Sequence, residues 1–166
     1  MCDADYADPP RRFMIFVAVA HFQKTTVTKP LVTVMRRPNF FMVGAGKSGT
    51  TSLYTWLSDH SQIFMSPNKE PRYFATDMPE LINRVATEAE YLSLFEKAEL
   101  QHLAVGEAST QYIFSQDAIP NIRDFDPQAR LIVTLRNPVE MAPSAHSEAR
   151  FWFFEDEADF EAAWLL

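Results

Sequence analysis

The residues of this chain best suited to chemistry lie in one short run, GAGKSGTT, from Gly44 to Thr51. The chain has only 4 glycines, and three of them fall inside this run. Glycine lets the backbone turn tightly and approach a ligand closely. Lys47 adds a mobile positive charge, and Thr50 and Thr51 add hydroxyl donors. The composition favours a phosphate site; the alternative is a plain turn between a strand and a helix, with an exposed lysine.

The segments on either side of this run predict a strand, a turn and a helix. Phe40–Val43 is a short apolar stretch typical of a buried strand, and Ser48–Ser58 has a helical period. Leu53, Trp56 and Leu57 would share one face of that helix. In such a unit the N–H groups of the turn and the positive end of the helix dipole point at one place. The order of elements therefore supports an anion site at the turn.

A second positive charge follows the strongest strand pattern in the chain, RLIVTL at Arg130–Leu135. A continuous β-branched run of this kind is typical of the middle of a parallel sheet. The strand would end at Arg136, after which Asn137 can cap a helix and Pro138 can occupy its first turn. A nucleotide hydrolase would need an acidic residue at such a strand end to hold magnesium. Arginine instead indicates a second anionic group, bound without a metal.

The spacing of the glycine-rich run differs from that of an ATP-binding Walker loop. A Walker loop has four residues between its first glycine and the Gly-Lys pair, whereas Gly44 and Gly46 are separated by one. The charge pattern thus favours a nucleotide with two separate anionic groups.

The other elements alternate between strands and helices. Further strands are expected at Gln62–Met65 and Leu103–Val105, and further helices at Pro79–Ala86, after a capping box at Thr87–Glu90, and at Asp117–Phe125. Alternation of this kind predicts an α/β fold with three layers, in which helices flank both faces of a parallel sheet. Residues 38–166 would form this domain, and residues 1–37 an N-terminal extension with no clear period.

Composition limits the classes of function. A length of 166 residues suits one domain, and a net charge of −7 argues against binding nucleic acid or an anionic membrane by bulk charge. The single cysteine excludes an internal disulfide and a cysteine-based zinc site. The histidines show no ligand spacing, so we expect no metal.

The N-terminal extension contains two arginines followed by eight apolar residues at 13–20, which weakly resembles a secretory signal. The run is far too short to span a membrane, and aspartates precede it. We expect an extra strand or an irregular extension there, an edge strand at 26–35, and a cytoplasmic protein.

Three motifs in order resemble the sulfotransferases that use 3′-phosphoadenosine 5′-phosphosulfate (PAPS), especially the carbohydrate branch of heparan-sulfate type. The first is K-[ST]-G-T-[TS]-x-L, present as KSGTTSL from Lys47 to Leu53. The second is K-E-x-x-[FY]-F, present as KEPRYF from Lys69 to Phe74. The third is R-N-P with a serine eight residues after the arginine, present as Arg136-Asn137-Pro138 and Ser144.

The resemblance implies a P-loop NTPase-like sulfotransferase fold and a role for each motif. The donor PAPS would be held without a metal by Gly46, Lys47, Ser48, Gly49, Thr50, Thr51 and Ser52 at its 5′ side, and by Arg136 and Ser144 at its 3′-phosphate. Lys47 would also act in catalysis, and Glu70 would be the base for a hydroxyl or amine of a glycan or small molecule. The alternatives are a solvated Glu70 paired with Lys69 or Arg72, and a structural salt bridge for Arg136.

The sequence departs from the family pattern at three places. Ala108 stands where many glycan-modifying members have a lysine, Pro143 lies inside the helix that carries Ser144, and family domains are longer. We therefore expect a chain truncated at its C-terminus, with an apolar end that favours self-association. A non-catalytic nucleotide-binding remnant and a P-loop kinase or NTPase stay open as alternatives.

Overall fold

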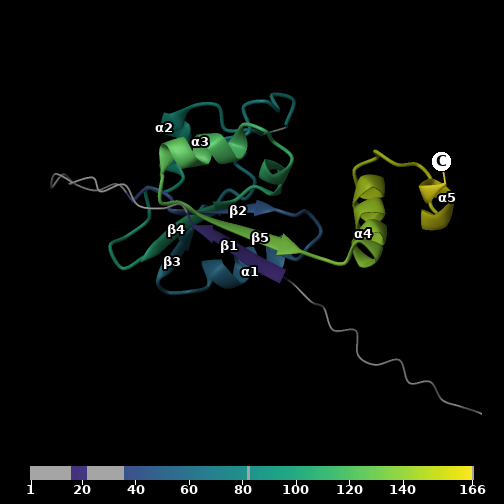
Figure 1. Ribbon diagram of the computed structural model, residues 1–166, viewed down its shortest axis with the longest axis horizontal. Helices are drawn as coiled ribbons and strands as arrows, with labels where there is room; N and C mark the ends of the chain where they lie inside the picture. Colours follow the sequence, from purple (N-terminus) through teal and green to yellow (C-terminus); the bar gives the residue numbers. More distant parts are fainter. Residues whose placement is uncertain (1–15, 22–35, 82, 166) are drawn as a thin grey trace, which may run out of the picture.

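The computed structural model describes residues 16–21, 36–81 and 83–165 of the chain. A five-stranded sheet in the order β1-β5-β2-β4-β3 forms its centre (Figure 1). The strands are β1 (Phe16–His21), β2 (Phe40–Gly44), β3 (Ile63–Met65), β4 (Ala104–Ala108) and β5 (Arg130–Leu135). β2 lies between β4 and β5, so the glycine-rich run leaves the sheet from a central strand.

Four of the strands are parallel, and all four were expected from the sequence. β2 pairs with β4 and with β5, and β3 pairs with β4, each in parallel register. The predicted α/β class with a parallel sheet is thereby confirmed. β1 is an exception to the parallel arrangement, because it pairs antiparallel with β5, from Phe16 opposite Leu135 to His21 opposite Arg130. The extra strand expected near the N-terminus is thus present, whereas the strand expected at 26–35 lies outside the described residues.

Helices cover both faces of the sheet. The helices of the described residues are α1 (Thr50–Ser58), α2 (Glu88–Ser93), the 3-10 helix η1 (Thr110–Ile113), α3 (Ala118–Phe125), α4 (Pro138–Phe151) and α5 (Phe160–Trp164). Figure 1 shows α2 and α3 over one face and α1 over the other. The helix expected after the capping box is α2, where the Thr87 side chain accepts a hydrogen bond from Glu90 N.

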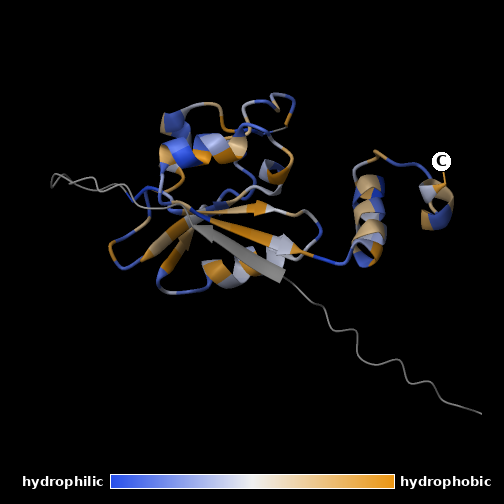
Figure 2. Ribbon diagram, in the orientation of Figure 1, coloured by the Kyte–Doolittle hydropathy of each residue, from blue (hydrophilic) through white to orange (hydrophobic). Residues whose placement is uncertain are grey.

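Alternating side chains of β2 fill the two halves of the core, as the period of a strand requires. Phe41 and Val43 belong to the cluster under α2 and α3, whereas Phe40 and Met42 belong to the cluster over α1. β2 and the middle of β5 are accordingly hydrophobic (Figure 2). The buried core fixes β2 from both sides and so fixes the start of the loop that follows it.

Two local predictions are wrong in detail. On α1, Leu53 and Leu57 pack against the core, but Trp56 is 67% exposed. No helix forms at 79–81 and 83–86. Asn83 there has a φ of 61°, which is incompatible with a right-handed helix, and Val85 N donates to Pro71 O at 2.9 Å. The tie to the Pro71 loop thus prevails over the local helical pattern.

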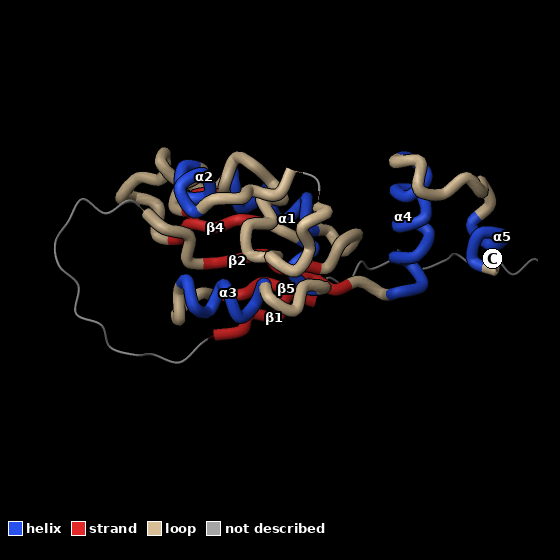
Figure 3. Tube along the Cα trace, turned by 90° about the horizontal axis from the view of Figure 1, so that it is seen from above, coloured by secondary structure: helices blue, strands red, loops and turns tan. Residues whose placement is uncertain are grey.

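Helix α4 begins as expected but packs differently from the other helices. The Asn137 side chain accepts a hydrogen bond from Val139 N at 3.0 Å, Pro138 occupies the first turn, and the helix continues past Pro143. Neither α4 nor α5 has a buried residue among those described. Figures 1 and 3 both show the two helices beyond the end of β5, set apart from the sheet. In the described ranges, no helix has the length and apolar character needed to cross a membrane.

Candidate donor site and base

The glycine-rich loop is shaped by contacts at both of its ends. Ala45 N donates to Thr134 O at 2.8 Å, and the Thr134 hydroxyl donates to Gly44 O at 3.2 Å, which ties the loop to β5. Gly44 has a φ of 154°, and a Cβ there would lie 2.9 Å from Cβ of Ile113. At Gly46 an added Cβ would meet nothing within 4 Å. The first glycine is therefore required by packing, whereas the second leaves its backbone open toward a cavity.

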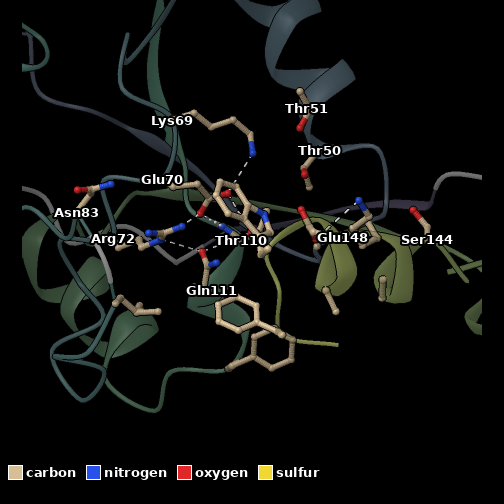
Figure 4. Close-up of a pocket in the computed structure, with 18 of the residues that line it drawn as sticks. Thr50, Thr51, Lys69, Glu70, Arg72, Asn83, Thr110, Gln111, Ser144 and Glu148 are labelled. Carbon is tan, nitrogen blue, oxygen red and sulfur yellow. Dashed lines mark hydrogen bonds and ion pairs between the residues drawn. The ribbon is translucent and has the colours of Figure 1, made fainter. Parts of the chain in front are cut away.

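That cavity has a volume of about 1100 Å³ and gathers residues from five segments of the chain, at 46–52, 68–72, 80–83, 110–114 and 144–154. Most of the predicted site residues line it: Gly46, Lys47, Gly49, Thr50, Thr51, Ser52, Glu70 and Ser144. Ser48 does not, because its side chain is buried and its hydroxyl donates to Gly46 O at 3.4 Å. Residues of one face of α4, among them Ser144 and Glu148, form a further wall of the cavity (Figure 4).

Lys47 meets a carboxylate that the sequence patterns did not single out. Its Nζ lies 3.7 Å from Oε2 of Glu148 on α4. Both side chains are partly exposed, so this ion pair is a weak one. A phosphate or sulfate bound at the loop would compete with Glu148 for the same charge.

Arg136 contacts the glycine-rich loop but does not line the cavity. Its guanidinium donates to Lys47 O at 3.4 Å, and its Nε lies 3.6 Å from Oε2 of Glu140 in the first turn of α4. Arg136 thus joins the end of β5 to the glycine-rich loop and to α4. The structural salt bridge considered for this arginine is present, and a role at the 3′-phosphate stays a prediction.

Glu70 is held by donors and cations on the opposite side of the cavity (Figure 4). Its Oε2 accepts from Thr110 N at 2.9 Å, and its Oε1 accepts from the Thr110 hydroxyl at 3.0 Å and from Lys69 Nζ at 3.1 Å. Arg72 Nε lies 3.7 Å from Oε2. The predicted pairings with Lys69 and Arg72 are present, but the side chain is only 16% exposed. The carboxylate is therefore oriented within the cavity wall and is not a freely solvated group.

Proteins similar to this chain are sulfotransferases. No family model matches the sequence. The membrane-associated sulfotransferase kil1 of Dictyostelium discoideum is 34% identical over 115 residues, which cover 69% of this chain and 24% of the relative. Human carbohydrate sulfotransferase 15 is 30% identical over an alignment of 144 residues that covers 62% of this chain and 26% of the relative.

A solved structure gives the same result. The crystal structure of a sulfotransferase from Alicyclobacillus acidocaldarius matches with a TM-score of 0.69 and 35% identity, over 76% of this chain and 55% of that one. The chain belongs to the sulfotransferase family. It spans about a quarter of the length of the curated relatives it matches. The resemblance drawn from the three motifs is thereby confirmed at the level of the family.

This sulfotransferase-family chain also contains a buried carboxyl group, Glu107, that the motifs did not identify. Its Oε1 accepts from the Tyr112 hydroxyl at 2.7 Å and from the Tyr91 hydroxyl at 3.4 Å, and its Oε2 accepts from the Ser109 hydroxyl at 2.8 Å. Burial raises the pKa of Glu107 to about 7, although its hydrogen bonds with Tyr112 and Ser109 oppose that shift. The strand expected to end at Val105 extends to Ala108, so Glu107 lies inside β4, which the sequence pattern did not indicate.

Part of the cavity wall in this family member is aromatic. Phe114, Trp152 and Phe154 line the cavity, as do the polar Asn83 and Gln111. The aromatic side chains come from the end of η1 and from the chain that follows α4, so no single motif contains them. An apolar wall with a few polar groups is typical of a site that binds a small molecule or sugar.

No metal centre is evident in the part of the chain that the structure describes. Within those ranges, no three His, Cys, Asp or Glu side chains gather closely enough to hold a metal ion.

Proposed function

We propose that this chain binds PAPS and transfers its sulfuryl group to a hydroxyl or amine of a glycan or small molecule. The observation that carries the proposal is the cavity that joins the Lys47 loop to Glu70. One side offers backbone amides and a cation for an anionic leaving group, and the other offers a carboxylate for the acceptor proton.

The donor would lie along the glycine-rich loop. Its 5′-phosphosulfate would contact Lys47 and the backbone from Gly46 to Ser52, where the open side of Gly46 leaves room for close approach. Arg136 and Ser144 would hold the 3′-phosphate, one at the end of β5 and the other on α4. The amides, the lysine and the arginine neutralise the nucleotide without a metal.

In the proposed step, the acceptor oxygen or nitrogen forms a bond to sulfur while the bond between sulfur and the bridging phosphate oxygen breaks. The electron pair of that bond stays on the leaving nucleotide, where Lys47 stabilises the charge. The acceptor proton moves to Glu70. A carboxylate has about four lone-pair sites, and three of those of Glu70 accept hydrogen bonds. The remaining site lies on Oε2, which is 3.7 Å from Arg72 Nε, and this site would take the proton.

A non-catalytic nucleotide-binding protein of this fold is the second candidate. Ala108, which stands where the resemblance places a lysine, is fully buried and supplies no charge to the cavity. Such a protein would bind the nucleotide without turnover.

The two candidates are separated by a transfer assay with radiolabelled PAPS and a panel of glycan and small-molecule acceptors. The chain and Glu70→Gln would be compared, with Glu96→Gln as a control on an exposed residue outside the cavity. Transfer by the chain and by Glu70→Gln at equal rates would exclude Glu70 as the base. Binding without any transfer would favour the second candidate.

We also propose that the chain self-associates through its exposed aromatic end. Large apolar side chains outside the cavity are exposed on α4, on α5 and between them: Phe151, Phe153 and Trp164. Apolar patches of this kind are commonly covered by a second protein surface. Light scattering across a range of concentrations, with Phe153→Ser as the variant, tests this.

A further inference from the structure

The loop that carries Glu70 is hydrogen-bonded to the segment that runs from the end of β4 into η1. Alternate backbone amides of the loop donate to three acceptors on that segment. The contacts are Glu70 N to Ala108 O at 2.8 Å, Arg72 N to Ser109 Oγ at 2.9 Å, and Phe74 N to Tyr112 Oη at 3.3 Å. Two of the three acceptors are side-chain hydroxyls, so their direction is not fixed by the backbone.

The loop has a conformation that its own residues disfavour. Glu70 has a φ of 65° and Arg72 a φ of 56°, and both are in the left-handed region that residues with a Cβ rarely adopt. Such backbone persists where surrounding contacts determine it. The three amide contacts therefore help to hold the loop in the conformation that brings the Glu70 carboxylate to Thr110.

Glu107 determines which way both hydroxyls face. The Ser109 hydroxyl donates its proton to Oε2 at 2.8 Å, and the Tyr112 hydroxyl donates its proton to Oε1 at 2.7 Å. Each oxygen then presents a lone pair to a loop amide, because its only proton is already used. The ionised carboxylate, which predominates above a pH of about 7, is suited to this task, since it accepts at both oxygens and offers no competing donor.

We propose that Glu107 is a positioning residue for the sulfuryl transfer: it fixes the two hydroxyls that hold the Glu70 loop in its productive conformation. Glu107 is fully buried and does not line the cavity, so it acts through its neighbours and not on a substrate. Thr110, which lies between Ser109 and Tyr112 in the sequence, contacts both oxygens of Glu70 directly. This inference rests on the function proposed for Glu70.

Tyr91 and Tyr112 provide a matched pair of variants for the test. Both tyrosines are fully buried, and both hydroxyls donate to the same oxygen of Glu107. Only the Tyr112 hydroxyl also accepts from the loop, at Phe74 N. Tyr112→Phe and Tyr91→Phe each remove one buried hydroxyl, but only the first removes an anchor of the loop.

The experiment compares these two variants and Glu107→Gln with the unaltered chain by two readouts. Hydrogen exchange of the amides from Glu70 to Phe74 reports on the loop whether or not the chain turns over. The kcat and the KM for PAPS report on the base side and the donor side of the site. We expect faster exchange at Phe74 and a kcat lowered about 10- to 100-fold in Tyr112→Phe, since misplacement of a reacting group by about 1 Å has an effect of this size.

Tyr91→Phe should leave both readouts near those of the unaltered chain, and Glu107→Gln should resemble Tyr112→Phe, with an unchanged KM for PAPS. Equal exchange and equal kcat in the two tyrosine variants would overturn the inference. If the unaltered chain shows no transfer, the proposed function fails, and the exchange of the loop amides alone decides whether Glu107 positions the loop.

Discussion

Lys47 and Glu148 form an ion pair of 3.7 Å that links the glycine-rich loop to α4. The pair places a carboxylate where the proposed donor would place its phosphosulfate. Binding of the proposed donor would therefore replace the Glu148 carboxylate beside Lys47 by the phosphosulfate group.

Glu148→Gln should strengthen binding of adenosine 3′,5′-bisphosphate about two- to fivefold at low salt. Removing the carboxylate frees Lys47 and removes a repulsive charge, and exposed pairs of this kind contribute about 0.2–1 kcal/mol. Titration calorimetry of both forms measures the effect. Glu161→Gln on α5 is the control, since Glu161 is exposed and outside the cavity. Equal affinity in all three proteins would show that Glu148 does not compete with the nucleotide.

The pKa of Glu107 predicts how stability varies with pH. Burial raises this pKa from 4.5 to about 7, so between these values the folded state holds a proton that the unfolded state has lost. The contribution of Glu107 to stability is thus present at low pH and is lost as the pH rises toward 7 and above. The change amounts to roughly 3 kcal/mol.

Denaturant unfolding at a series of pH values, for the chain and for Glu107→Gln, isolates this contribution as the difference between the two curves. The other carboxyl groups titrate alike in both proteins. A difference that stays constant from about pH 4.5 to 7 would mean that the folded and unfolded states bind this proton equally.

Substitution by alanine should affect stability at Gly44 and nucleotide binding at Gly46. Gly44→Ala places a Cβ 2.9 Å from Ile113 on backbone with a φ of 154°, and should lower the free energy of unfolding by about 1–3 kcal/mol. Gly46→Ala meets nothing within 4 Å and should change stability by less than about 0.5 kcal/mol, while its methyl group hinders the approach of the nucleotide. Thermal unfolding and bisphosphate titration of both variants measure these effects. If Gly46→Ala lowered stability as much as Gly44→Ala does, the conclusion that packing requires a glycine at 44 but not at 46 would be wrong.

The sequence predicts the sheet and the loop well because both depend on local signals. The four parallel strands have apolar runs, and the glycines at 44, 46 and 49 mark a turn between a strand and a helix. The capping signals at Thr87 and Asn137 correspond to observed helix starts, since a cap is formed within four residues.

The rest of the site depends on contacts between distant segments. Glu107 accepts from Tyr91 and Tyr112, and no pattern within β4 shows that these side chains meet it. The same holds for Glu148, which reaches Lys47 from another element. Residues 79–81 and 83–86 have a helical pattern but form turns, because Val85 is tied to the Pro71 loop across fourteen positions of sequence.

The measurement that tests the central claim most directly is titration of the purified chain with adenosine 3′,5′-bisphosphate, beside ATP with magnesium. We expect the bisphosphate to bind and ATP–magnesium to bind more weakly. Lys47→Ala should weaken bisphosphate binding about 10- to 100-fold, as expected for the loss of a charge-assisted hydrogen bond. The exposed Lys97, which lies outside the cavity, gives the control variant Lys97→Ala, which should bind like the unaltered chain. Tighter binding of ATP–magnesium, or bisphosphate binding that does not depend on Lys47, would contradict a PAPS site at this loop.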